Sequence, residues 1–435
     1  MSNKTLIISI DGMAAKYLKN SKIQLKNMKN LMKKGVFCDQ LTTVFPTSTW
    51  TIHTSVVTGT YPGKHGVLGN WVFDRQKNEK GEFFGDREYD KDKVVSVPAL
   101  YDVAKEYGYT TASLCWPVTR GASKIDWNIP EFYEQELFDE FATQTFWEEL
   151  KRSGYPVHKY GEWSTDHGQG HLQDHLTAKI AEYLFINKQP DITFLHFLLV
   201  DSYHHDYGND SPQVYWAIEY IDSLLGELMN TLENENLSNQ TDVYLFSDHG
   251  LTDMKREFYP NRLFAEKGWI NRNQKERSSV IAVSNGGSLL IYLNDKENVT
   301  VESVSDVLRN ESAVDLLFTR DDFPSSGFPG EGEWPLVCPD MIVGLKHDTY
   351  AVEDDKEGPV YMEVQSAKGK HGHFPNSEDL TPFFIAAGPS IGSGKIENMH
   401  IVDIAPTIAF NYQLPFSHSD GRILKQIFKG GEALD

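Results

Sequence analysis

Seven residues whose side chains suit metal binding and nucleophilic chemistry lie in five short segments of the chain. Carboxylate and imidazole groups are ligands for zinc or manganese, and a hydroxyl on such an ion can act as a nucleophile near neutral pH. The set could hold two divalent ions flanking one hydroxyl, so it indicates phosphoester cleavage. The residues are Asp11, Thr49, Asp201 with His205, Asp248 with His249, and His371.

The identity of the hydroxyl is open on chemical grounds, because several hydroxyl groups precede a short helix predicted over Thr54–Gly59. A helix N-terminus offers a positive dipole and free backbone N–H groups to a phosphate. Helix capping is the commoner use of such residues. The candidates are Thr47, Ser48, Thr49 and Thr51.

Asp201 and His205 are four residues apart, so both side chains face the same way if the chain between them forms a helical turn. On spacing alone, His204 and Asp206 compete with them as ligands.

Three of the carboxylates follow apolar runs that are predicted to be buried strands. In an open α/β sheet the carboxyl ends of the strands form the edge where ligands bind, so residues distant in the chain can meet there. Each residue alone has another explanation, since Asp is a common helix N-cap and Asp-His-Gly is a plausible turn. The runs are Leu6–Ile10 before Asp11, Ile192–Val200 before Asp201, and Val243–Phe246 before Asp248.

The order of the elements predicts an α/β fold. Strand-like runs alternate with amphipathic helical patterns, which is typical of a mostly parallel central sheet with helices on both faces. The further strands are Thr110–Leu114 and Phe383–Ala387, and the helices are Pro98–Tyr107, Leu172–Ile186 and Pro212–Leu232.

Residues 255–349 have a different pattern of short strands and Gly/Pro-rich turns, which predicts a smaller inserted α+β cap. The catalytic core would then comprise 1–254 and 350–435, with a small insertion at about 125–170 that carries its own helix around Glu134–Ser153. Within the cap we expect strands at Val280–Val283, Ser288–Leu293, Val314–Phe318 and Met341–Leu345, and a helix near Val301–Leu308.

Composition excludes some classes of partner. The formal net charge of −21 argues against a grip on nucleic acid and against binding to anionic membranes. No apolar run is long enough to cross a bilayer, and the N-terminal run is too short for a signal peptide. The cysteines Cys38, Cys115 and Cys338 suggest neither a disulfide framework nor a thiolate cluster. We therefore expect a cytoplasmic protein with a small-molecule phosphoester substrate, whose oligomeric state the sequence leaves unknown.

The motifs in combination resemble the type I phosphodiesterase/nucleotide pyrophosphatase family of the alkaline phosphatase superfamily. The resemblance covers most of the chain outside the insertions and implies an alkaline-phosphatase-like fold. The matching segments are 8–12, 45–50, 58–66 followed by Asn70, Asp201 with His205, 247–250 and 370–372. Two further segments, 403–407 and 420–422, resemble the scaffold at the end of the superfamily fold.

The resemblance assigns a role to each residue of the set. It implies that Thr49 is the nucleophile, that a phosphothreonine forms by in-line attack, and that water activated on the second metal hydrolyses it. Two zinc ions are the default, and the ligand types also admit manganese or iron. One ion would be held by Asp11, Thr49, Asp248 and His249, and the other by Asp201, His205 and His371.

Two more residues acquire substrate-binding roles from the same resemblance. Asn70 would donate its amide to a non-bridging phosphoryl oxygen, and a turn asparagine is the alternative. Trp50 would stack on a nucleotide base, and packing in the core is about equally expected. We expect His53, His65 and His373 to support the site or to pack rather than to bind metal.

Other activities stay open at this point. A phosphonate hydrolase or a phosphomonoesterase of the same superfamily is the close alternative, and a metal-dependent protein that only binds phosphate ligands is the non-enzymatic one. A sulfatase is disfavoured, because its C/S-x-P-x-R motif is not found around Thr49.

Overall fold

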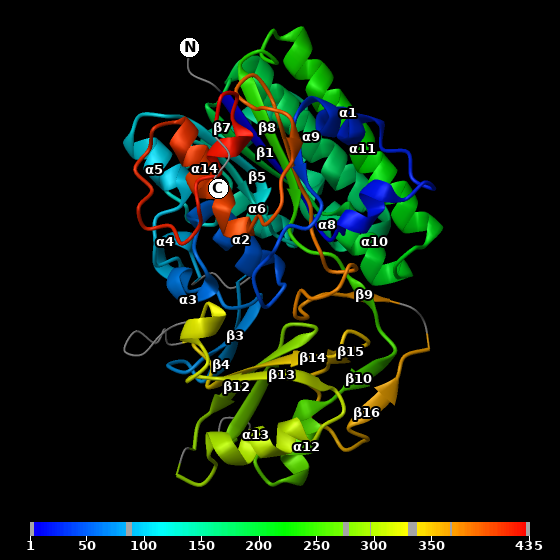
Figure 1. The fold of residues 1–435 in the computed structure, drawn as a ribbon. Helices are drawn as coiled ribbons and strands as arrows, with labels where there is room; N and C mark the ends of the chain where they lie inside the picture. Colours follow the sequence, from blue (N-terminus) through cyan, green and yellow to red (C-terminus); the bar gives the residue numbers. More distant parts are fainter. Residues whose placement is uncertain are drawn as a thin grey trace.

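The computed structural model describes residues 4–83, 89–272, 278–295, 297–328, 337–365 and 368–431. A larger body contains the central sheet between layers of helices, and a smaller body of short strands and helices lies at one end of it (Figure 1).

The central sheet has eight strands in the order β19-β2-β18-β8-β1-β7-β5-β6. Strand β1 runs parallel to both β7 and β8, and β5 runs parallel to β7 and β6. Strand β18 is antiparallel to its neighbours β8 and β2. The predicted mostly parallel α/β sheet is therefore confirmed. The strands are β1 (Lys4–Ile10), β2 (Val36–Cys38), β5 (Thr111–Trp116), β6 (Trp127–Pro130), β7 (Ile192–Phe197), β8 (Thr241–Ser247), β18 (Phe384–Ala387) and β19 (Gly394–Lys395).

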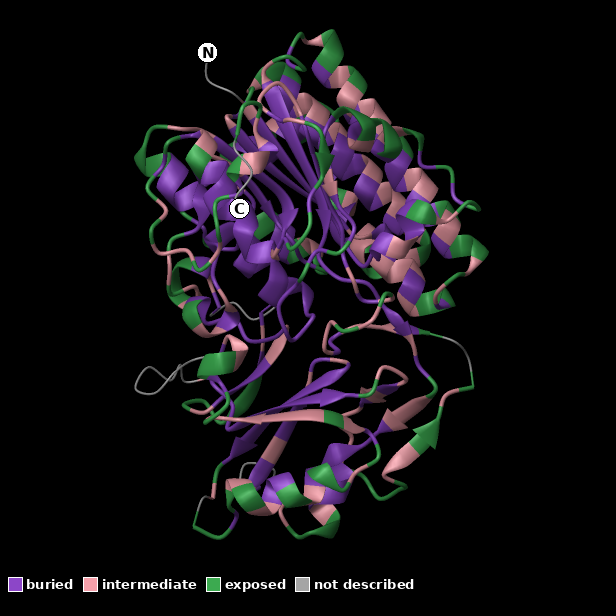
Figure 2. Cartoon of the chain, in the orientation of Figure 1, coloured by how far each residue is buried: buried purple, intermediate pink, exposed green. Residues whose placement is uncertain are grey.

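Side chains alternate between the two faces of the central sheet, and each face is covered by helices. Leu6, Ile8 and Ile10 of β1 lie in one apolar cluster, whereas Ile7 lies in the other. The strands are buried almost throughout (Figure 2). The helices of the first face are α1 (Lys26–Lys34), α9 (Gly170–Asn187), α10 (Leu199–Tyr207) and α11 (Pro212–Asn234), and those of the second are α2 (Thr49–Thr58), α5 (Leu100–Glu106) and α14 (Ile404–Asn411).

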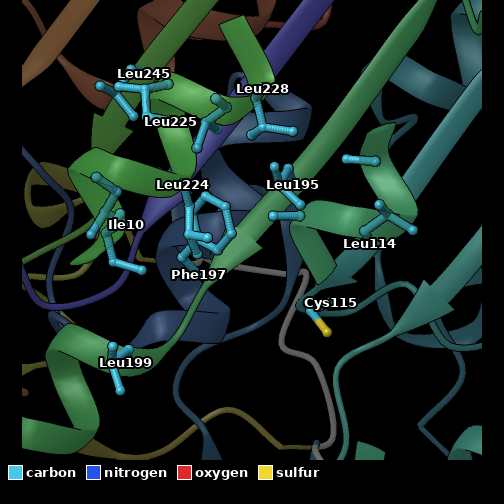
Figure 3. Packing of buried hydrophobic residues seen from close by; sticks show 14 of the residues in the cluster. Ile10, Leu114, Cys115, Leu195, Phe197, Leu199, Leu224, Leu225, Leu228 and Leu245 are labelled. Atoms are coloured by element: carbon cyan, nitrogen blue, oxygen red, sulfur yellow. The ribbon is translucent and has the colours of Figure 1, made fainter. Parts of the chain in front are cut away.

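Helix α11 illustrates how the sequence forms this layer. Ser211 is its N-cap and accepts a hydrogen bond from the backbone N–H of Val214 at 3.3 Å, and Pro212 occupies the first turn. Leu224 and Leu228 of this helix pack toward Leu195 of β7 (Figure 3). Full burial of one such leucine contributes roughly 1.5–3 kcal/mol.

The segment 125–170 joins the main body more closely than the sequence suggested. Strand β6 lies within it and is the edge strand of the central sheet. The single helix expected around Glu134–Ser153 was wrong, because the chain breaks at Ala142–Thr143, where Thr143 binds the backbone of Asn128 through both its N–H and its Oγ1. The helices are α6 (Gln135–Phe141), α7 (Gln144–Arg152) and α8 (Tyr160–Thr165).

The smaller body contains an antiparallel sheet in the order β11-β12-β14-β13. Two helices cover one face, and the hairpin β3–β4 packs against the other. The elements lie where the sequence predicted them: β11 (Val280–Ser284), β12 (Ser288–Leu293), β13 (Val314–Thr319), β14 (Met341–Leu345) and α13 (Val301–Arg309). The remaining elements are β3 (Trp71–Asp74), β4 (Glu79–Glu82) and α12 (Pro260–Glu266).

The boundaries proposed for the cap, 255–349, stay a prediction. A second small sheet, in the order β15-β10-β16, pairs β10 (Arg256–Phe258) with β15 (Thr349–Ala351) and with β16 (Tyr361–Glu363), which lies beyond the second boundary. Among the described residues, no helix is long and apolar enough to cross a membrane. The cytoplasmic location stays a prediction.

Candidate metal centre and active site

The central strands β8, β1 and β7 lie side by side and deliver three carboxylates to the same edge of the sheet. Asp11 and Asp248 directly follow β1 and β8. Strand β7 ends at Phe197, earlier than predicted, and Asp201 stands in the first turn of α10. The parallel register thus brings together residues that are distant in the chain.

Helix α2 begins at Thr49, earlier than predicted, and places this hydroxyl against His249. Three oxygen atoms surround Nε2 of His249: Oγ1 of Thr49 at 3.3 Å, Oδ2 of Asp248 at 3.3 Å and Oδ1 of Asp11 at 3.4 Å. Tetrahedral metal–ligand bonds of about 2.0–2.1 Å place neighbouring ligands about 3.3–3.4 Å apart. This group therefore has the spacing of ligands around one zinc-sized ion.

A second group lies beside the first and consists of Asp201, His205 and His371. Nε2 of His205 is 3.1 Å from Oδ2 of Asp201, and Nε2 of His371 is 4.0 Å from its Oδ1. Nδ1 of His205 donates to the carbonyl of Gly369 at 2.8 Å, and Nδ1 of His371 donates to the carbonyl of Thr47 at 2.7 Å. These bonds fix the rings and leave each Nε2 free to bind a metal.

Asp201 has ligand atoms within reach of both groups. Its carboxylate lies in one cluster with His205 and His371, and in another with Asp11 and His249. The two groups are also in contact through the rings of His249 and His371, which stack at a centroid distance of 4.0 Å. The residues therefore form one continuous centre.

In the part of the chain that the structure describes, each carboxylate of this centre has an oxygen atom that accepts no hydrogen bond. Within the described residues, Oδ1 of Asp11, Oδ1 of Asp201 and Oδ2 of Asp248 are buried without a hydrogen bond. Burial and the neighbouring carboxylate of Asp248 raise the pKa of Asp11 well above its ordinary value, and burial raises that of Asp248 to about 6. Such crowded negative charge calls for bound cations, so the residues present fit divalent metal ions.

The imidazoles of His249 and His371 are held neutral, as metal ligands must be. Burial lowers the pKa of His249 to about 4 and lowers that of His371 well below its ordinary value. Although burial acts to raise the pKa of Asp201, the neighbouring His205 holds it well below its ordinary range.

Two buried imidazoles contact residues of the centre without belonging to either group of metal-suited residues. Nδ1 of His53 donates to the carbonyl of Thr49, and its Nε2 accepts from the hydroxyl of Ser9, both at 2.8 Å. His196, which the sequence analysis did not select, has Nε2 3.3 Å from Oδ2 of Asp11. A histidine in the middle of a buried strand was the available signal. His65 and His373 make hydrogen bonds to Ser55 and Thr349, away from the two groups.

The structure separates the competing candidates for hydroxyl and ligand. Of the four hydroxyl residues only Ser48 and Thr49 line the pocket, since Oγ1 of Thr47 donates to the carbonyl of His373 and Thr51 is fully buried. His204 is buried against the ring of Tyr17, and Asp206 pairs with His167 at 2.9 Å.

Asn70 lines the pocket beside the first turn of α2. Its Oδ1 accepts a hydrogen bond from the backbone N–H of Trp50 at 3.1 Å. This contact orients the amide and leaves Nδ2 available as a donor toward the pocket.

Trp50 does not lie where substrate stacking requires. Its ring is 1% exposed and packs beside Phe83, and its Nε1 donates to Oε2 of Glu131 at 3.1 Å. The prediction that Trp50 stacks on a base is therefore not supported, because an apolar cluster between the two bodies encloses its ring.

Four other aromatic side chains line the pocket. They were not predicted, because nothing in the local sequence distinguishes an aromatic residue that lines a pocket from one that packs in the core. Trp71 and Tyr350 come from the side of the smaller body, whereas Tyr133 and Trp163 come from the segment 125–170. Tyr133 is 45% exposed. The cavity has a volume of about 540 Å³ and spans both metal-suited groups and Asn70.

The central sheet, with helices on both faces and metal-suited residues at the carboxyl ends of its strands, has the alkaline-phosphatase-like α/β fold. Comparison with known protein families makes the assignment specific. The type I phosphodiesterase / nucleotide pyrophosphatase family matches residues 5–374, so the chain belongs to this family of phosphoric ester hydrolases.

Relatives and solved structures that resemble the chain include nucleotide pyrophosphatases/phosphodiesterases. The chain is 25% identical to human bis(5'-adenosyl)-triphosphatase ENPP4 over 93% of its own length and 76% of the relative. It is 24% identical to human ectonucleotide pyrophosphatase/phosphodiesterase family member 5, over 93% and 73%. The structure of murine ENPP5, as an inactive variant in complex with AMP, has the same fold, with a TM-score of 0.71, 20% identity and coverage of 98% and 100%.

Proposed function

We propose that the chain hydrolyses phosphodiester or nucleotide pyrophosphate bonds with Thr49 as the nucleophile. The observation that carries this proposal is the contact of Thr49 Oγ1 with Nε2 of His249 at 3.3 Å, among carboxylates with the spacing of metal ligands. The N-terminus of α2 adds a positive dipole beside the same hydroxyl.

Two divalent ions, with zinc as the expected metal and manganese or iron as alternatives, would neutralise phosphoryl charge and lower the pKa of the attacking hydroxyl when bound. Thr49 attacks phosphorus in line with the leaving group, a phosphothreonine forms, and water then hydrolyses it. We propose that Asp11, Thr49, Asp248 and His249 hold one ion and that Asp201, His205 and His371 hold the other, with Asp201 near both.

Asn70 stabilises the charge that develops during this reaction. Its Nδ2 donates to a non-bridging phosphoryl oxygen, and its contact with the N–H of Trp50 keeps the amide in place beside Thr49. We propose that Trp71 and Tyr133, rather than Trp50, offer ring faces to the organic part of the substrate, because both line the pocket.

The relatives support a nucleotide-type substrate. One is a bis(5'-adenosyl)-triphosphatase, and the inactive murine ENPP5 variant, in which alanine replaces a threonine, is in complex with AMP. Both names are consistent with a pocket that joins a phosphoryl-transfer centre to exposed aromatic rings.

The test is the variant Thr49→Ala, assayed with bis(p-nitrophenyl) phosphate and analysed for metal content. We expect turnover to be abolished while bound metal is retained, and Thr49→Ser to recover part of the activity because it restores a hydroxyl. Undiminished turnover by Thr49→Ala would refute the nucleophile, and a protein that neither binds nor needs a divalent ion would refute the proposed reaction.

A further inference from the structure

Two lysines line the pocket, and among the described residues only Lys80 forms a direct ion pair with a carboxylate. Nζ of Lys80 lies 2.9 and 3.0 Å from the two carboxylate oxygens of Glu353. In the part of the chain that the structure describes, Nζ of Lys370 has neither a hydrogen bond nor an ion pair. It lies over the ring of Tyr350, 5.4 Å from the ring centroid. The carboxylates of Asp201 and Asp206 attract this ammonium without forming an ion pair with it. A partly buried ammonium with no carboxylate in direct contact is costly, which makes it a candidate binding group.

The backbone of Lys370 is fixed at the edge of the metal centre. Strand β17 (Gly369–Lys370) pairs with β9 (Thr252–Asp253), and the carbonyl of Gly369 accepts a hydrogen bond from Nδ1 of His205. The next residue is His371, whose ring is tied to Thr47. Lys370 therefore stands between residues that are anchored to the second metal-suited group, and its position relative to that group is set by the fold.

In-line displacement determines which part of a substrate lies beside Lys370. Thr49 contacts the group of Asp11, Asp248 and His249. The leaving group must depart opposite Thr49, so it lies toward Asp201, His205 and His371, beside Lys370. A cation there meets the leaving group rather than the phosphoryl group that is transferred.

We propose that Lys370 binds an anionic phosphate in the leaving group, next to the scissile phosphorus, and thereby selects phosphoanhydrides over diesters with an uncharged leaving-group body. The inference rests on the proposed function. The bond from Thr49 Oγ1 to phosphorus forms and the bridging P–O bond breaks. Its electron pair leaves on the bridging oxygen of the pyrophosphate, and the hydroxyl proton of Thr49 passes to solvent. Lys370 then faces the charge that accumulates on the departing group.

The experiment uses two substrates that share the transferred AMP group and differ in the leaving group: ATP, which releases pyrophosphate, and the p-nitrophenyl ester of AMP. We expect Lys370→Met in the metal-loaded protein to lower kcat/KM for ATP about 10- to 100-fold more than kcat/KM for the ester, the range for loss of a charged hydrogen bond. Lys370→Arg should recover much of the loss because it keeps the positive charge.

Lys368→Met is the matched control, because it removes the same charge from an exposed position two residues away. It should leave the ratio of the two kcat/KM values as in the wild type. A binding readout completes the test: Lys370→Met should raise the inhibition constant of inorganic pyrophosphate more than that of orthophosphate.

Four results separate the possible failures. Equal losses on both substrates, or failure of Lys370→Arg to restore the ratio, would overturn the role of Lys370 while leaving the proposed function intact. A change of the ratio in Lys368→Met equal to that in Lys370→Met would show that general surface charge is responsible and would also overturn it. A wild-type protein that cleaves neither substrate would overturn the proposed function itself.

Discussion

His249 illustrates how single residues define the centre, because its Nε2 lies 3.3 to 3.4 Å from one oxygen each of Thr49, Asp248 and Asp11. The three contacts come from three separate segments of the chain, and none of them satisfies the free carboxylate oxygens. Asp248 is held on its other oxygen by the backbone N–H groups of Gly12 and His249 at 3.1 and 2.8 Å. The second oxygen therefore points to the centre, which is the geometry of a carboxylate prepared for a metal ion.

A first prediction concerns the side-chain amide of Asn70. Asn70→Ala should lower kcat about 10²- to 10³-fold with a smaller effect on KM, as for the loss of one donor that stabilises transition-state charge. Steady-state kinetics with bis(p-nitrophenyl) phosphate measure both constants. Asn187→Ala, at the exposed end of α9, is the control for the same chemical change. A fall in kcat below threefold, by contrast, would show that Asn70 is the turn residue that the sequence also allowed.

The second prediction concerns Asp174, a buried carboxylate on α9 that accepts hydrogen bonds from the N–H groups of Leu198 and Leu199 at the start of α10. Burial raises its pKa from 3.8 to about 7. A raised carboxyl pKa means that its contribution to stability is complete below about pH 4 and is lost as the pH rises through 7, at a cost of up to about 4 kcal/mol.

Asp174→Asn keeps an acceptor for the two N–H groups and removes the titration. We expect its free energy of unfolding, relative to the wild type, to be higher at pH 8 than at pH 4.5, as measured by urea titration at each pH. Asp166→Asn, at an exposed site before α9, should show no such dependence. An identical difference at both pH values would mean that Asp174 keeps an ordinary pKa.

Among the elements, the turn between β11 and β12 connects the smaller body to the active site. Oδ1 of Asn285 accepts from the N–H of Trp71 at 3.0 Å, and its Nδ2 donates to the carbonyl of Trp71 at 2.9 Å. The N–H of Gly287 donates to the carbonyl of His371 at 2.8 Å. At Gly286 φ is +76°, and an added Cβ would lie 2.3 Å from that carbonyl oxygen. The turn thus holds the residue after Asn70 and one metal-suited histidine.

This arrangement predicts that Asn285→Ala reduces activity although Asn285 need not contact substrate. Loss of two buried hydrogen bonds should lower the free energy of unfolding by about 1–3 kcal/mol and loosen Asn70, so that kcat falls more than KM changes. Thermal unfolding and steady-state kinetics measure the two effects. Asn310→Ala, at the exposed end of α13, is the control within the same body. If Asn285→Ala lowers stability but leaves kcat unchanged, the turn serves the fold alone.

Local sequence patterns predict the elements of this chain well where burial alone decides them. Continuous apolar runs predicted β1, β8, β12 and β14 to within two residues at each end, because a strand buried on both faces is mostly apolar along its length. Trp50 shows where such reasoning ends. Its apolar surroundings come from Phe83 and the rest of a cluster between the two bodies, and its partner Glu131 is far away in the chain. The pocket aromatics Trp71 and Tyr133 were missed for the same reason.

On the scale of the whole molecule, the site is a product of topology. Parallel pairing of β8, β1 and β7 brings the carboxylates together, and His371 joins them from a segment that contacts the smaller body. The net charge of −21 acts against binding a polyanion, so a bound phosphate depends on local cations. Metal ions and Lys370 would supply that local charge, which limits tight binding to this one pocket.

Because the ligands converge only in the folded chain, metal binding should stabilise the fold as a whole. A ligand at 1,000 times its Kd adds about 4 kcal/mol to the free energy of unfolding. We expect chelator treatment to abolish activity and to lower Tm by several degrees, and zinc to restore both. His371→Ala should show a smaller gain of Tm with zinc, whereas His158→Ala, for which no metal-suited group is found in the described residues, should behave as the wild type. A Tm that is the same with chelator and with zinc would mean that the clustered carboxylates bind no ion with appreciable affinity.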